Sequence, residues 1–149
     1  YLLPEGYGIL SIDFRNHGDS DGDRTSLGVY ELLDARAAYD FLIAQDEVEQ
    51  VVIFGHSMGG AVATRLMQDV GAAGLMIDAA FADFPSIVSA GVIARGFPDP
   101  PVSGILLTMY SLLSGADWDA IHPEAHIARI DTPIRGRFRV RSQTTGEIN

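Results

Sequence analysis

The chain has 149 residues, 47% of them hydrophobic, and its 20 acidic and 10 basic side chains give a formal charge of −10. This length suits one domain, and the apolar content excludes a disordered protein, which could not bury enough surface to offset its chain entropy. The negative charge argues against nucleic-acid binding, and the absence of cysteine excludes disulfides, thiolate zinc sites and a cysteine nucleophile.

The first predicted element is a strand at residues 7–14, an apolar run that closes near Asp13. Residues 15–26 are rich in turn formers and predict a loop, with Ser26 placed to cap the next element. From residue 27 to about residue 45, apolar side chains recur at spacings of three and four. That spacing predicts an amphipathic helix packed on a sheet.

A second strand is predicted at residues 50–54, followed by a glycine-rich turn at 55–60 and a helix at 61–70. A third strand is predicted at residues 74–80. Strands that alternate with helices favour a parallel sheet with right-handed crossovers. We therefore expect an α/β fold with helices on both faces of the sheet.

Beyond residue 81 the alternation stops, and prolines punctuate short helical pieces. Residues 100–116 carry no charge, but they include prolines and glycines and are shorter than the ~20 residues that a membrane-spanning helix needs. We interpret residues 85–120 as an apolar cap or lid and do not expect a membrane span. With no signal peptide visible, the cytoplasm is the default compartment.

The turn at residues 55–59 matches Gly-x-Ser-x-Gly, a nucleophile elbow, and lies between a predicted strand and a predicted helix. Gly55 and Gly59 are expected where a Cβ would collide with the returning backbone, with His56 as a packed flank. Ser57 would be the nucleophile, and the N–H of Met58 would donate to an oxyanion. The alternatives are an ordinary turn or a phosphate site, and the latter is disfavoured because the chain has no lysine.

Together with the stretch Asp13-Phe14-Arg15-Asn16-His17-Gly18-Asp19-Ser20, the elbow makes residues 1–134 resemble the middle of an α/β-hydrolase-fold protein. The resemblance is to small serine hydrolases of the lipase, esterase, monoacylglycerol-lipase-like or serine-aminopeptidase-like kind. It implies hydrolysis of an ester, thioester or amide through an acyl-enzyme on Ser57, with no cofactor and no metal. It also implies a second oxyanion N–H from a loop that would precede Tyr1.

The family's triad runs Ser, acid, His, and its acid and histidine are expected after Ile134, where the sequence has arginine-rich residues instead. Other acidic residues and histidines follow Ser57 in the chain and could replace the missing acid and histidine in that order. They are Asp78, Asp83, Asp117, Asp119, His122 and His126. For each of them a structural role is the more economical interpretation. His17 is a candidate substrate contact, because it follows the end of a predicted strand.

Asp19, Asp21 and Asp23 alternate in a way that suggests calcium, but an EF-hand glutamate and its flanking helix are missing. A solvated turn is the expectation there. The apolar residues of the cap favour a small-molecule substrate with an apolar acyl or aromatic group.

The last fifteen residues differ in charge from the rest. Six arginines and 19 acidic residues give −13 to residues 1–134, whereas four arginines and one acidic residue give +3 to residues 135–149. We expect this basic tail to lie outside the fold, as a frameshift near residue 134 would produce. The alternative function is therefore a truncated or noncatalytic hydrolase piece, which open sheet edges would lead to oligomerise or aggregate.

Overall fold

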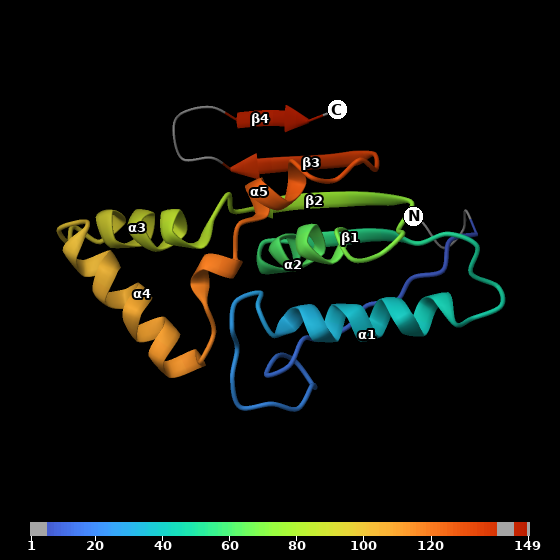
Figure 1. The fold of residues 1–149 in the computed structure, drawn as a ribbon, viewed down its shortest axis with the longest axis horizontal. Helices are drawn as coiled ribbons and strands as arrows, with labels where there is room; N and C mark the ends of the chain where they lie inside the picture. Colours follow the sequence, from blue (N-terminus) through green and yellow to red (C-terminus); the bar gives the residue numbers. More distant parts are fainter. Residues whose placement is uncertain (1–5, 140–144, 149) are drawn as a thin grey trace.

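The structure is a computed structural model that describes residues 6–139 and 145–148. Its centre is a four-stranded sheet in the order β1-β2-β3-β4 (Figure 1). The first three strands are parallel and β4 is antiparallel to β3. The strands are β1 (Val52–His56), β2 (Gly74–Ala80), β3 (Ile134–Arg139) and β4 (Thr145–Ile148).

Helices connect the parallel strands, which confirms the predicted α/β class. They are α1 (Glu31–Ile43), α2 (Met58–Leu66), α3 (Phe84–Ala94), α4 (Pro101–Ser114), α5 (Pro123–Ile127) and the 3-10 turn η2 (Trp118–Ala120). Helix α1 begins four residues later than the periodicity indicates, because Leu27 and Gly28 have positive φ angles that a helix does not allow. Strand β2 has the predicted bounds.

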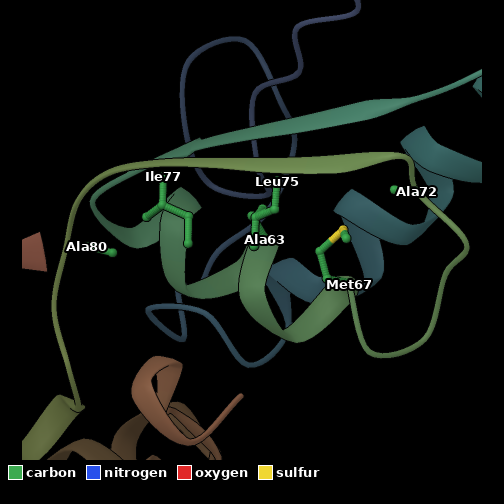
Figure 2. Close-up of a cluster of buried hydrophobic side chains, with 6 residues drawn as sticks. All are labelled: Ala63, Met67, Ala72, Leu75, Ile77 and Ala80. Atoms are coloured by element: carbon green, nitrogen blue, oxygen red, sulfur yellow. The ribbon is translucent and has the colours of Figure 1, made fainter. Parts of the chain in front are cut away.

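The main core lies between β2 and α2 (Figure 2). Leu75 and Ile77 are two residues apart on β2, so their side chains point to the same face of the sheet. There they pack against Ala63 and Met67 of α2. All four side chains are buried. The packing of α2 on β1 and β2 fixes the turn that joins β1 to α2.

The opposite face of the sheet carries exposed apolar side chains. Val52 and Phe54 of β1 and Met76 of β2 are 55%, 64% and 48% exposed. Helices α1 and α5 pack against α2 and so lie on the covered side. The expectation of helices on both faces thus holds for one face of the part that the structure describes.

Residues 7–14 form no strand and no helix, which differs from the prediction of a strand. Tyr7 and Ile9 are 62% and 59% exposed, and Leu10 and Ile12 line an open cleft of about 540 Å³ together with Phe41 of α1. A strand exists only where a neighbour supplies its ladder hydrogen bonds. Within the described residues, this segment has the apolar pattern of a strand without that neighbour.

The basic tail also differs from the expectation, because residues 134–139 and 145–148 form β3 and β4 of the sheet. Ile134 is the register partner of Leu75. Apolar or small residues alternate with arginines along β3, which is the period of a strand. The positive charge of this segment is therefore no sign that it lies outside the fold. The rest of the expected tail, residues 140–144 and 149, lies outside the described residues.

The expected cap corresponds to α3, α4 and η2, which lie beyond the carboxyl ends of β1 and β2 (Figure 1). A second buried cluster of Ala61, Phe84 and Ile121 joins this region to α2. Among the described residues, no helix has both the length and the apolar character needed to cross a membrane.

Candidate active site

Ser57 occupies the turn between β1 and α2 in a backbone conformation that L-residues rarely adopt. Its φ and ψ angles are 52° and −117°, and it is the N-cap of α2. Its N–H donates to the carbonyl of Asp78 on β2 at 2.9 Å, and its carbonyl accepts from the N–H of Gly60 at 3.0 Å. The residue is therefore fixed at both ends of its strained turn.

Two glycines make this turn feasible. A Cβ on Gly55 would lie 2.3 Å from the carbonyl oxygen of Gly59, and one on Gly60 would lie 2.8 Å from the Cβ of Ala80. A Cβ on Gly59 would meet only Phe14, at an ordinary 3.9 Å. The backbone therefore requires glycine at position 55, as expected. The second position that requires glycine is 60, whereas the sequence had suggested Gly59.

Met58 is the first residue of α2, so its N–H has no acceptor within the helix. The helix dipole adds partial positive charge at this end. An anion that forms beside Ser57 would find both features, which is the arrangement expected of one half of an oxyanion hole.

His56, the residue before Ser57, pairs with a carboxylate. Its Nδ1 lies 3.0 Å from Oδ2 of Asp78, its register partner on β2. Both side chains are more than half exposed, at 62% and 53%. His56 is therefore an exposed partner of Asp78, whereas the expectation was that its side chain would be packed beside the elbow.

The Asp13-to-Ser20 stretch forms a tightly bonded loop. Asp13 accepts from the N–H of Asp19 at 3.1 Å, and a Cβ on Gly18 would lie 2.1 Å from the Asp13 carboxylate. Arg15 binds the Asp34 carboxylate with both Nε and Nη2, and these hydrogen bonds lower the pKa of Asp34. The loop is thereby tied to α1.

His17 lies in this loop, and its Nδ1 contacts the carbonyl of Arg15 at 2.9 Å. Its side chain is exposed. The loop approaches the elbow through Phe14, whose ring lies beside Gly59. A substrate contact by His17 stays a prediction.

The substitute triad residues have other partners. Asp83 and Asp117 cap α3 and η2, and Nε2 of His122 lies 3.1 Å from Asp119. Burial lowers the pKa of His126, whose Nδ1 is buried without a hydrogen bond in the part of the chain described. No histidine of residues 6–139 hydrogen-bonds to Ser57 Oγ.

The described residues include no group of three or more His, Asp or Glu side chains arranged to hold a metal ion. Asp19, Asp21 and Asp23 form part of the exposed loop. Asp19 and Asp21 take part through their main chains, in bonds to Asp13 and Asn16.

Helix α4 divides into two faces. Its inner face carries Leu107 and Tyr110, which pack on the cluster around Phe84. The Tyr110 hydroxyl donates to the carbonyl of Ser26, and burial raises the pKa of Tyr110 to about 12. The outer face exposes apolar side chains of Ile105, Leu106, Met109, Leu112 and Leu113.

Comparison with known families gives a match to the family described as the alpha/beta hydrolase family, over residues 1–145. Among curated relatives, the chain is 34% identical over 84 residues to human Protein ABHD12B. It is 38% identical over 67 residues to the lysophosphatidylserine lipase ABHD12 of Xenopus tropicalis. These matches cover 56% and 45% of this chain but 23% and 17% of the relatives.

Among solved structures, an esterase from Pyrococcus furiosus superposes with a TM-score of 0.67 and 23% identity. The match covers 91% of this chain and 51% of the esterase. At this identity the likeness is evidence of a shared fold.

Proposed function

This chain belongs to the alpha/beta hydrolase family, and from that premise we propose that it carries the nucleophile of a serine hydrolase acting on ester, thioester or amide bonds. The observation that carries the proposal is Ser57 itself. Its positive φ at the junction of β1 and α2 is a strained conformation, and such strain concentrates at functional sites. The family match and the names of the relatives, a lipase and an esterase, support the same reaction class.

In this reaction Ser57 Oγ attacks the substrate carbonyl carbon while its proton passes to a base. The negative charge that forms on the carbonyl oxygen is stabilised by the N–H of Met58. Collapse breaks the bond to the leaving group, which departs with a proton and leaves an acyl ester on Ser57. Water then attacks this ester, the carboxylic acid is released, and the hydroxyl of Ser57 regains its proton.

The proposed substrate is a small molecule with an apolar acyl group. The cap lies beyond the carboxyl ends of the strands, the edge where α/β proteins bind ligands. Seventeen of its 36 residues, 100–116, form an uninterrupted uncharged stretch. A relative's name, lysophosphatidylserine lipase, points to the same substrate class.

A second candidate is that the chain as given has no turnover of its own. It is favoured by the surroundings of Ser57, since no histidine in the described residues hydrogen-bonds to its Oγ. Loss of the base lowers the rate of such enzymes by several orders of magnitude even when the serine is intact.

Hydrolysis of p-nitrophenyl esters by the full chain, with acyl groups of two to twelve carbons, separates the two candidates. The first predicts turnover that rises with acyl length and is abolished by Ser57→Ala. Equal rates for the wild type and Ser57→Ala at every length would reject it and favour the second. Turnover confined to acetate would reject the apolar substrate alone.

We also propose that copies of the chain associate through the edge of β1. This strand is an outer strand of the described sheet. The side chain of its residue Phe54 is exposed on the uncovered face, next to the free edge of the strand. An unpaired parallel edge with apolar neighbours is a template for association.

A further inference from the structure

The strongest feature outside the proposed mechanism is the point where β1 and β2 both leave regular strand geometry. His56 and Asp78 face each other as register partners across the two strands. Ser57, which follows His56, and Ala79, which follows Asp78, both have a φ of +52°. Directly after Asp78 the pairing of β2 with β3 also shifts register. The His56–Asp78 pair is thus the last register pair between β1 and β2.

Asp78 holds this turn through two separate groups. Its carbonyl accepts from the N–H of Ser57 at 2.9 Å, which extends the ladder one residue past β1. Its carboxylate lies 3.0 Å from Nδ1 of His56. Because an ionised carboxylate only accepts hydrogen bonds, Nδ1 of His56 is the donor. The residue before the nucleophile and the nucleophile's own N–H are therefore bound to the same residue.

We propose that Asp78 is a positioning residue for Ser57: its carboxylate holds His56, and through it the end of β1, so that the Ser57 turn keeps its catalytic geometry. The inference rests on the proposed serine-hydrolase function. Among the described contacts, neither Asp78 nor His56 hydrogen-bonds to Ser57 Oγ through its side chain. Both act on its placement and take no part in the chemistry.

The size of the effect follows from the exposure of the pair. A single contact between two exposed side chains biases a conformation only weakly, so its loss should slow reaction at Ser57 by about two- to fivefold. The midpoint of thermal unfolding should change little for the same reason. A rate loss without a matching stability loss is the signature that a purely structural role would not produce.

The test measures the rate at which a fluorophosphonate labels Ser57 in the full chain, for Asp78→Ala, His56→Ala and the double variant. Each single variant should label two- to fivefold more slowly than the wild type, and the double variant no more slowly than either. Asp78→Asn, which keeps an oxygen opposite His56, should restore most of the rate. The matched control is Asp40→Ala, which breaks the similarly exposed Arg36–Asp40 pair of 2.9 Å on α1 and should leave the labelling rate unchanged.

Single-variant rates equal to that of the wild type would overturn the inference, as would additive losses in the double variant. If Asp78→Ala fails to fold, His56→Ala tests the same contact from the other strand, and an unchanged rate there rejects it. A wild type that is never labelled overturns the proposed function and this inference together. A labelled wild type with unaffected variants overturns this inference alone.

Discussion

Gly55 lies so close to the backbone of Gly59 that a Cβ added to Gly55 would stand 2.3 Å from the Gly59 carbonyl oxygen. This contact lets the chain double back between β1 and α2. The requirement comes from backbone atoms, which cannot move aside as a flexible side chain could. The elbow therefore tolerates a methyl group at one of these two glycines and not at the other.

Gly55→Ala should lower the free energy of unfolding by about 1–3 kcal/mol, the usual effect of overpacking. Gly59→Ala is the matched control, because its Cβ would make an ordinary contact with Phe14 and alanine favours a helix by up to about 1 kcal/mol. Urea denaturation of both variants measures the difference. Equal destabilisation by the two substitutions would be incompatible with the steric account of the turn.

Glu31, at the start of α1, is fully buried and accepts four hydrogen bonds from Thr25, Ser26 and Gly28, at 2.6 to 2.9 Å. Replacing its carboxylate with an amide places N–H groups opposite these donors. We expect Glu31→Gln to cost about 1–3 kcal/mol at pH 7, measured by urea denaturation. An unchanged free energy of unfolding would show that the carboxylate does not hold this turn.

The same carboxylate predicts a pH dependence. Burial by itself would raise the pKa of Glu31, but hydrogen bonds from Ser26 and Gly28 outweigh it and hold the pKa below its ordinary value of 4.5. A lowered pKa contributes stability above pH 4.5 that is lost as the pH falls through the folded-state pKa. The wild type should therefore lose more stability between pH 5 and pH 3 than Glu31→Gln does. Parallel pH profiles for the two proteins would contradict the assignment.

The Tyr110 hydroxyl donates a hydrogen bond to the carbonyl of Ser26 and so helps to tie α4 to the loop before α1. Tyr110→Phe removes this donor and leaves the Ser26 carbonyl with only the long hydrogen bond from the N–H of Val29, at 3.4 Å, at an expected cost of about 1 kcal/mol in the free energy of unfolding. Tyr7→Phe serves as the control, because Tyr7 is 62% exposed. Thermal and urea unfolding check both variants, and a control that loses as much as Tyr110→Phe would speak against the tether.

The uncovered face and edge of β1 predict self-association. Light scattering after size-exclusion chromatography should give a mass above the 16.0 kDa of one chain. Phe54→Lys should shift the distribution toward the monomer, since edge lysines oppose strand pairing. A wild type that is monomeric at every concentration and melts cooperatively would refute this proposal.

The sequence was sufficient for the elements whose patterns are local. The apolar runs and glycines around Ser57 predicted a strand, a turn and a helix where β1 and α2 lie, although β1 is shifted by two residues and α2 by three to four. The strand at residues 74–80 has the predicted bounds. These elements rest on periodicity and turn chemistry, which neighbouring residues determine.

Features that depend on distant partners were not predictable in this way. Residues 7–14 have a strand pattern, but a ladder needs a neighbouring strand. The steric role of Gly60 arises from Ala80 on the next strand, and the His56–Asp78 pair arises from the register of β1 with β2. For β3, the alternation of arginines with Ile134, Gly136 and Phe138 was a usable signal that the charge count concealed.

The central claim, that Ser57 is a nucleophile, is tested most directly by locating the adduct that a fluorophosphonate forms with the full chain. Tandem mass spectrometry of the digested protein should find the phosphonyl group on Ser57, and the Ser57→Ala variant should remain unmodified. An unmodified wild type, or an adduct on another residue that persists in Ser57→Ala, would contradict the account.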